Sequence, residues 1–403
     1  MKKRLFFICC ILLASAGILT AACASSSRLP ARKKLIKYGQ DRPTPSDAAA
    51  HIREMEKRPF DGIVMTLTGK NKGNIFRGGK WDAADYAADM EALKKIKWGT
   101  FTDNFLIMNA ASAMDWFSDQ DWDNIVSNVE IMATAAKAGR CNLAFDPEPY
   151  GKNPWHYKVQ AHAKEKSFGD YEAKVRQRGA QFIEAIQKHL PETVLLTLFS
   201  YSIFPNITDQ PTAAKRTQMI GQQELYGLYP AFLSGILDAM GPGITVIDGN
   251  EPSYYYPDTH SFYTGYHLMR QTALGLVPPE DTDTFLLQTQ AGHALYFDYI
   301  FGTVKWKNIL AQFMTEKERL KWWEHNVYWA LKTTDEYVWL WNERMNWWKE
   351  EGMPPGMEQA LISAREKIAQ QKPLGFEIDE FMDRAQKAKA AAKEKELLEN
   401  AED

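Results

Sequence analysis

The chain has 403 residues and a formal net charge of −3, with 48 Lys and Arg residues against 51 Asp and Glu residues. Because there is no excess of basic residues, we expect no nucleic-acid partner. Aromatic residues make up 12% of the chain and include 13 tryptophans. This content fits both a large core and flat faces that stack on sugar rings.

The first residues predict export from the cell. Residues 1–4 are basic, residues 5–20 are apolar, and small residues follow at 21–24, which is the pattern of a secretory signal peptide. The apolar run is too short, and too closely followed by polar residues, to favour a membrane span. We therefore assign 1–24 to a signal peptide and the basic stretch 25–42 to a flexible tether.

The end of the signal allows two kinds of cleavage. Residues 19–23, Leu-Thr-Ala-Ala-Cys, are similar to a bacterial lipobox, which predicts lipidation of Cys23 and a cell-envelope lipoprotein, in the periplasm or at the cell surface. Thr20 stands where a lipobox usually has an aliphatic residue, so ordinary cleavage after Ala24 and secretion are the alternative. Beyond the signal, Cys141 is the single cysteine; it lies in an apolar run and is predicted to be a buried thiol.

Short apolar runs alternate with longer helical patterns from residue 43 to residue 375. The runs are nearly continuous, which is typical of parallel strands covered on both faces. In chain order, strands are predicted at 60–67, 104–108, 141–145, 193–199, 244–247, 284–288 and 337–341. Helices are predicted at 82–96, 122–138, 171–189, 224–240, 262–274 and 316–331, with a charged helical tail at 376–403.

This alternation predicts an α/β fold, namely a single (β/α)8 TIM-type barrel over residues 43–375. A closed barrel is favoured over an open sheet because no glycine-rich phosphate loop follows the first strand. Seven strands are predicted directly. The eighth lies within 296–306 unless that stretch is helical.

Acidic residues close several of the predicted strands. In a βα barrel the active site forms at the carboxyl ends of the strands, so we expect these residues to share one pocket. They are Asp146 and Glu148 after the third run, Asp248, Asn250 and Glu251 after the fifth, and Asn342 and Glu343 after the last.

Two of these acids are predicted to point the same way. If the strand continues through Glu148, then Asp146 and Glu148 project to one side, because side chains alternate along a strand. Two neighbouring carboxylates hold their pKa values apart, so one can stay protonated while the other is charged. Hydrolysis of a glycosidic bond needs such a pair, and we take Asp146, Glu148 and Glu251 as catalytic candidates. The alternative is that these acids cap helices or bind loop amides.

The remaining polar and aromatic residues near these strand ends are candidates for substrate binding, because sugar subsites combine aromatic platforms with hydrogen-bonding groups. His293 is included because it follows a strand end, although a core or helix-capping role is its alternative. No histidine spacing predicts a metal site, and no cofactor is expected. The predicted binding residues are Tyr150, Trp155, Asp248, Asn250, Tyr254, His293, Trp341, Asn342 and Glu343.

The strand that closes in Asp146-Pro147-Glu148 resembles the D-x-E strand end of the chitinase and endo-N-acetylglucosaminidase clan. That resemblance implies that Glu148 is the acid and that Asp146 steers a substrate acetamido group acting as nucleophile. It covers one short motif, and the upstream residues 140–145 contain no further acid. The rest of the chain resembles exported bacterial proteins regarded as glycosidases.

Together these observations predict a glycoside hydrolase that acts on an extracellular or periplasmic glycan, with an oligo- or polysaccharide as its partner. One alternative is a noncatalytic glycan-binding lipoprotein on the same barrel. A polysaccharide lyase is disfavoured because no basic cluster accompanies the strand ends.

Overall fold

The computed structural model describes residues 33–402, apart from residues 78, 112, 113 and 224. Within them, nine strands form one sheet in the order β7-β6-β5-β4-β3-β2-β1-β9-β8, and every pair is parallel. The strands are β1 Lys34–Lys37, β2 Gly62–Met65, β3 Phe105–Asn109, β4 Asn142–Asp146, β5 Thr193–Thr197, β6 Ile244–Asp248, β7 Thr289–Ala291, β8 His293–Tyr296 and β9 Tyr337–Trp341.

The strands at the two ends of this order, β7 and β8, together occupy one strand position of the barrel. Only Gly292 separates β7, which pairs with β6, from β8, which pairs with β9. A Cβ atom on Gly292 would lie 2.9 Å from a methyl carbon of Ile247 and 3.0 Å from the carbonyl oxygen of Asp248, so only glycine fits at this bend. The sheet therefore closes on itself as an eight-position barrel, and the predicted (β/α)8 fold is confirmed.

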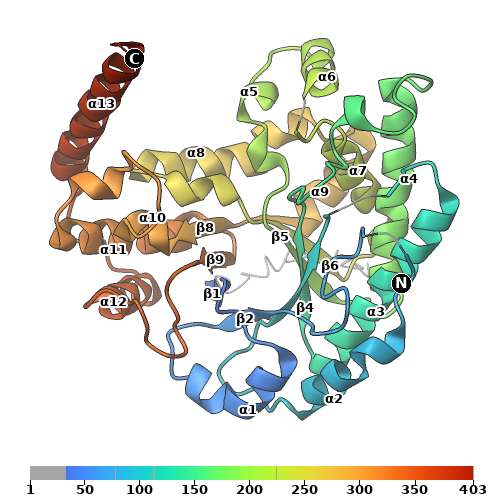
Figure 1. Cartoon of the computed structure of the whole chain (residues 1–403), viewed down its shortest axis with the longest axis horizontal. Coiled ribbons are helices and arrows are strands. Elements are labelled where there is room, and N and C mark those ends of the chain that lie inside the picture. Colours follow the sequence, from blue (N-terminus) through green and yellow to red (C-terminus); the bar gives the residue numbers. More distant parts are fainter. Residues whose placement is uncertain (1–32, 78, 112–113, 224, 403) are drawn as a thin grey trace, which may run out of the picture. The chain divides into compact units, whose positions relative to one another are not determined.

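Helices surround the strands (Figure 1). Several begin with reciprocal side-chain caps that the sequence encodes: Thr44 with Asp47 at α1, Ser167 with Asp170 at α4, and Thr315 with Glu318 at α11. The helices are α1 Pro45–Met55, α2 Ala87–Lys95, α3 Asp119–Gly139, α4 Phe168–Gln187, α5 Pro205–Thr208, α6 Ala213–Gln222, α7 Tyr229–Ala239, α8 Thr259–Arg270, α9 Thr282–Gln288, α10 Phe297–Phe301, α11 Glu316–Thr333, α12 Met357–Ala369 and α13 Asp379–Glu402.

The barrel begins earlier than the sequence predicts. Strand β1 lies inside the stretch 25–42 that was assigned to a tether, so that assignment is wrong from Lys34 onward. The two lysines of β1 interrupt the apolar run by which a strand is predicted. Each has an acidic partner: Lys34 pairs with Asp103, and the buried Lys37 pairs with Asp41. The signal peptide, Cys23 and the first part of the tether lie outside the described residues.

The predicted strand at 284–288 is also wrong. These residues form the greater part of helix α9, and Leu287 is 82% exposed there. The strand follows directly as β7 and β8, and it ends at Tyr296. The stretch 296–306 begins with helix α10, which was the alternative considered for it. Within the apolar run 284–288, Phe285 is buried on one face of the helix, whereas Leu286 and Leu287 are exposed.

The core contains many of the aromatic residues. Trp322 and Trp323 of α11 are fully buried, and Trp323 packs on Phe297 of α10. Cys141 is buried as predicted, and burial raises the pKa of its thiol to about 12, so the reactive thiolate is suppressed. Among the described residues, no helix has the length and apolarity to cross a membrane.

Candidate active site

The acidic residues singled out in the sequence follow parallel strands, so they gather at one rim of the barrel. Asp146 is the last residue of β4, and Asp248 is the last residue of β6. After Asp248 the chain turns sharply, with Asn250 in the left-handed conformation (φ 46°), and Glu251 then opens a short 3₁₀ turn. Glu343 stands two residues beyond the end of β9.

Asp146, Glu148 and Glu251 lie within electrostatic range of one another. Burial raises the pKa of Glu251 to about 9, and the negative charges of Glu148 and Asp146 contribute to this rise. Burial likewise raises the pKa of Asp146 to about 7, with Glu148 as the next cause. One oxygen of Glu251, Oε2, is buried without a hydrogen-bond partner among the described residues. Burial and the neighbouring acids therefore favour the protonated form of Glu251.

The loop after β4 fixes the two acids of the D-x-E motif differently. Asp146 is 2% exposed, and its two carboxyl oxygens accept hydrogen bonds from Asn109 Nδ2 (3.1 Å) and from the backbone amide of Glu148 (2.9 Å). Glu148 is half-buried, and its carboxylate accepts a hydrogen bond from the hydroxyl of the exposed Tyr150. Asp146 is thus held by the protein, whereas Glu148 has an accessible carboxylate.

Glu343 lies near the same acids, because Tyr255 is within electrostatic range of Glu343, Glu148 and Glu251. Burial raises the pKa of Tyr255 to about 12, and the charges of Glu251, Glu148 and Glu343 add to that rise. The backbone amides of Glu343 and Arg344 donate to the buried Asp298, at 2.7 and 3.2 Å, which fixes the chain after β9. The side chain of Glu343 is exposed and lies beside the Tyr296 hydroxyl, where a ligand can reach it.

Exposed or half-buried aromatic rings flank the acids on two sides. Trp341 is half-buried and packs on Tyr38, with ring centroids 4.8 Å apart. On another side, Tyr255 is 43% exposed and Trp306 is 50% exposed, and their centroids are 6.2 Å apart. Accessible ring faces next to acidic groups are what a sugar subsite requires.

Three of the predicted binding residues have structural roles instead. Asp248 is buried and accepts four hydrogen bonds, from the amides of Ser200, Ser202 and Asn250 and from the Ser202 hydroxyl, so its oxygens are occupied. Asn250 is fully buried and donates to His293 Nδ1 (3.0 Å). His293 donates from Nε2 to the Thr333 hydroxyl (3.0 Å), and burial lowers its pKa to about 3, so it is a neutral core histidine.

Three further predicted binding residues are buried as well. Trp155 is fully buried, and its indole nitrogen donates to the carbonyl oxygen of Pro147 (2.6 Å), so it anchors the loop that carries Glu148. Tyr254 is 5% exposed and packs between Trp339 and Tyr296. Asn342 is buried in the turn after β9, where its amide donates to Met345. These side chains shape the site but offer no ring or amide to a ligand.

Sequence reasoning missed three residues that belong to the site. Asn109 ends β3 and holds Asp146, and a polar residue closing an apolar run is a signal that could have identified it. Tyr38 follows β1, whose lysine-rich strand was not predicted. Trp306 lies in a loop, and no sequence signal distinguishes it from the buried tryptophans.

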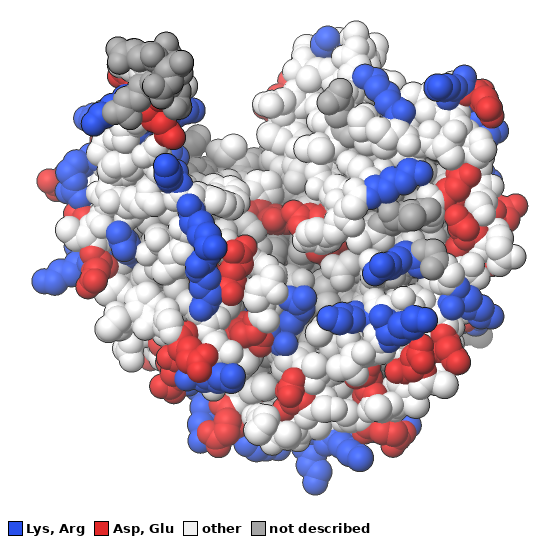
Figure 2. All heavy atoms as spheres, viewed as in Figure 1, with Lys and Arg blue, Asp and Glu red and all other residues white. Residues whose placement is uncertain are grey.

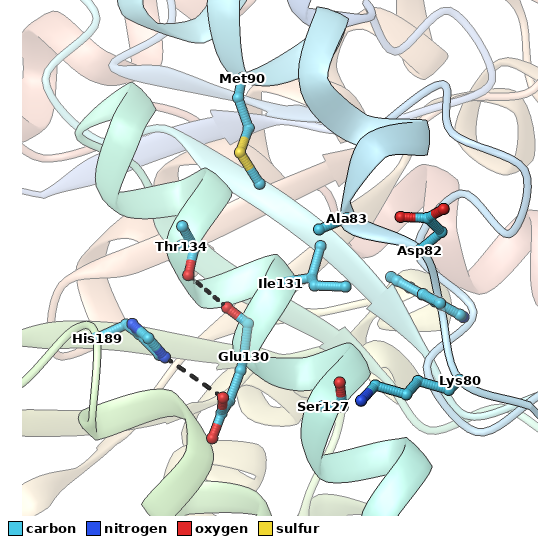
Figure 3. Close-up of a pocket in the computed structure, with 10 residues that line it drawn as sticks. Lys80, Asp82, Ala83, Met90, Ser127, Glu130, Ile131, Thr134 and His189 are labelled. Carbon is cyan, nitrogen blue, oxygen red and sulfur yellow. Dashed lines mark hydrogen bonds and ion pairs between the residues drawn. The ribbon is translucent and has the colours of Figure 1, made fainter.

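Figure 2 shows acidic side chains at the bottom of a hollow near the centre of the face in view. Two cavities lie away from the acids. One, of about 530 Å³, opens on the helical layer, where Met90 of α2 and Ile131 of α3 form an apolar wall opposite the His189–Glu130 pair (Figure 3). The other, of about 780 Å³, lies beside α1. Neither is lined by Asp146, Glu148 or Glu251, so the chemistry belongs to the rim of the barrel.

Comparison of the sequence with protein-family models and with curated proteins finds no match in either. Among solved structures, the chain is similar to a native Bacteroidetes-affiliated GH5 cellulase linked with a polysaccharide utilization locus, at 10% identity and a TM-score of 0.43 over 85% of this chain and 88% of that one. It is similar to a family 5 xyloglucanase from Paenibacillus pabuli, at 9% identity and 0.44 over 83% and 98%.

A third similarity is to a sugar phosphate isomerase/epimerase from Parabacteroides distasonis, at 9% identity and a TM-score of 0.33 over 89% of this chain and 99% of that one. The neighbours thus include glycoside hydrolases, but they also include an enzyme of another class. At these identities and scores the similarities assign no activity to this chain. The barrel assignment rests on the strand pairing, and the functional argument rests on the site.

Proposed function

We propose that this protein is a glycoside hydrolase that cleaves an exported or environmental glycan with Glu251 and Glu148. The observation that carries the proposal is the unequal state of the two carboxyl groups. Burial raises the pKa of Glu251 to about 9, so it holds a proton at neutral pH, while the accessible Glu148 contributes negative charge beside it. Glycoside hydrolysis needs one carboxylic acid and one carboxylate at the same bond.

In this proposal Glu251 is the general acid. It donates its proton to the glycosidic oxygen as the bond to the anomeric carbon breaks, and the leaving sugar departs as a neutral alcohol. Glu148 stabilises the positive charge that develops on the sugar ring, and attacks the anomeric carbon or deprotonates the attacking water. Tyr150 supports that role because its hydroxyl hydrogen-bonds the carboxylate and orients it.

These roles differ from those that the D-x-E resemblance implies, in which Glu148 is the acid and Asp146 steers an acetamido group. Both oxygens of Asp146 already accept hydrogen bonds from Asn109 and from the amide of Glu148. Asp146 is therefore assigned here as a positioning residue for the loop that carries Glu148. Sugars stack on the exposed rings of Tyr255 and Trp306, next to Glu343.

The test is a screen of the purified protein against plant, algal and bacterial polysaccharides together with a panel of aryl glycosides. We expect new reducing ends from at least one glycan, and no release from the heat-denatured protein. A noncatalytic glycan-binding protein on the same barrel would bind a glycan from the panel without releasing sugar. That result would contradict the proposal.

We also propose that the mature protein is a cell-envelope lipoprotein acylated at Cys23. Several acyl chains on one cysteine give stable membrane attachment, whereas ordinary cleavage after Ala24 gives a soluble protein. Fractionation of cells that express the full chain tests this, with Cys23→Ala as the matched variant. We expect the wild type in the membrane fraction and the variant in the soluble fraction. Equal solubility of the two would overturn the lipoprotein assignment.

A further inference from the structure

The cavity of about 780 Å³ beside helix α1 has polar walls from three parts of the chain. Arg42 comes from the loop after β1, His51 comes from α1, and Trp348 and Lys349 come from the segment after β9. We call this space the α1 cavity. Its volume lies in the range of small-molecule and saccharide sites, about 300–1,000 Å³.

The acidic residues that line the α1 cavity are already engaged by other groups. Asp41 binds the buried ammonium of Lys37 (2.6 Å) and the amide of Trp347 (2.9 Å). Asp47 caps α1 by accepting from the amide and hydroxyl of Thr44. The other two form ion pairs with cations of the same cavity, Glu54 with Lys57 and Glu350 with Arg58.

Three of the basic residues, Arg42, His51 and Lys349, form no ion pair with a described acid. Arg42 donates from Nη1 to the carbonyl oxygen of Gly39 (3.2 Å), but its Nε is buried with no hydrogen-bond partner in the described part of the chain. The side chains of His51 and Lys349 form no hydrogen bond or ion pair with any described residue. The buried Nε has no surface open to the cavity, so the donor that Arg42 can offer to an anionic ligand is Nη2, which has no hydrogen-bond partner among the described residues.

Arg42, which lines the α1 cavity, lies near Tyr38, the residue that follows strand β1. The guanidinium carbon of Arg42 lies 5.8 Å from the centroid of the Tyr38 ring. Burial raises the pKa of Tyr38, and the charge of Asp146 is the next cause, with smaller contributions from Glu251 and Glu148. Tyr38 is therefore near both Arg42 and the acids.

We propose that the α1 cavity is a subsite for an acidic sugar, in which Arg42 binds the carboxylate of a uronic acid unit. The guanidinium group matches a carboxylate because two parallel N–H donors meet two oxygens. Trp348 supplies an apolar ring for the sugar, and Lys349 adds a second cation. This inference rests on the proposed function, because it places the neighbouring sugar of the same glycan at Glu148 and Glu251.

The test measures binding, so that it does not depend on turnover. Tryptophan fluorescence follows titration of the protein with oligouronides of two to six units, and with the same oligosaccharides after reduction of their carboxyl groups. We expect the acidic ligands to bind the wild type at least about tenfold more tightly than their reduced forms, and we expect added salt to weaken that preference. Equal affinity for both forms would overturn the proposal.

The variant Arg42→Gln is compared with Lys57→Gln, which removes the same charge from the same cavity but from a lysine already paired with Glu54. We expect Arg42→Gln to abolish the preference for acidic ligands while its affinity for the reduced ligands stays unchanged. We expect Lys57→Gln to retain the preference for acidic ligands. Loss of both affinities in a folded Arg42→Gln protein, or equal losses in the two variants, would contradict a carboxylate contact. Lys349→Gln, which leaves the loop after β1 intact, is expected to lower the affinity for acidic ligands only.

The products separate this inference from the proposed function. New reducing ends without ultraviolet-absorbing ends indicate hydrolysis, whereas an unsaturated uronate indicates a lyase and would overturn the hydrolase assignment. An Arg42-dependent preference for the acidic ligands supports the subsite in either case. Turnover of neutral glycans without that preference would overturn the subsite and leave the hydrolase intact.

Discussion

Replacement of Glu148 by glutamine is expected to lower kcat by about 10⁴-fold or more while the fold remains intact. The amide keeps the shape and can still accept the hydrogen bond from Tyr150. However, it carries no negative charge to stabilise the developing positive charge and cannot attack or deprotonate water. The loss should be similar for substrates with poor and with good leaving groups, because neither reaction proceeds without the carboxylate. Steady-state kinetics on a natural glycan and on a dinitrophenyl glycoside measure both.

The matched control is Glu192→Gln. Glu192 is exposed and immediately precedes β5, so it lies at the opposite end of the barrel from the acids. This control should leave kcat and the thermal melting temperature unchanged. Turnover of Glu148→Gln within a few-fold of the wild type would remove Glu148 from the mechanism. External azide offers a second check on Glu148→Ala, since a small anion can restore activity only where a missing carboxylate leaves room for it.

The sequence predicts the barrel and its acidic rim for a physical reason. In parallel strands covered by helices, nearly every strand residue is apolar, so the first acid after each run marks a carboxyl end. This rule locates Asp146, Asp248 and Glu343, and Glu251 follows Asp248 by three residues. Strand β1 is not predicted because Lys34 and Lys37 interrupt its apolar run, although acids neutralise both lysines in the fold: Asp103 pairs with Lys34, and Asp41 pairs with Lys37.

The functions of individual site residues depend on contacts that sequence spacing does not encode. His293 looks like a site residue until its two ring nitrogens are seen to bond Asn250 and Thr333, which are 43 and 40 residues away in the sequence. Trp155 and Trp306 both lie near predicted strand ends, yet the first is fully buried and the second is half exposed. The difference arises from packing between distant loops, which a local pattern cannot report.

Replacement of Glu251 by glutamine is expected to discriminate between leaving groups, which Glu148→Gln does not. If Glu251 donates the proton, its loss should lower kcat on a natural glycan by about 10²–10⁴-fold. A dinitrophenolate departs without protonation, so cleavage of that substrate should fall by far less. The wild type should also lose activity as the pH rises through about 9, where Glu251 loses its proton, and the residual dinitrophenyl activity of the variant should lack that decline.

The pH dependence of protein stability gives an independent test of the protonation state of Glu251. The pKa of Glu251 is about 9 in the folded protein and about 4.3 for an unperturbed glutamate, so the folded state binds the proton more tightly than the unfolded state does. By linkage, its contribution to stability is fully present below pH 4, falls as the pH rises from about 4 to about 9, and changes no further above that. Glu251→Gln cannot ionise and escapes this loss.

The melting temperature of Glu251→Gln should therefore exceed that of the wild type by an amount that grows from pH 4 to pH 9. A catalytic acid that destabilises the fold at neutral pH is a cost that activity requires. Equal losses on both leaving groups, together with a melting difference that does not vary with pH, would show that Glu251 is ionised in the pocket. The acid would then have to be Glu148, as the D-x-E resemblance implies.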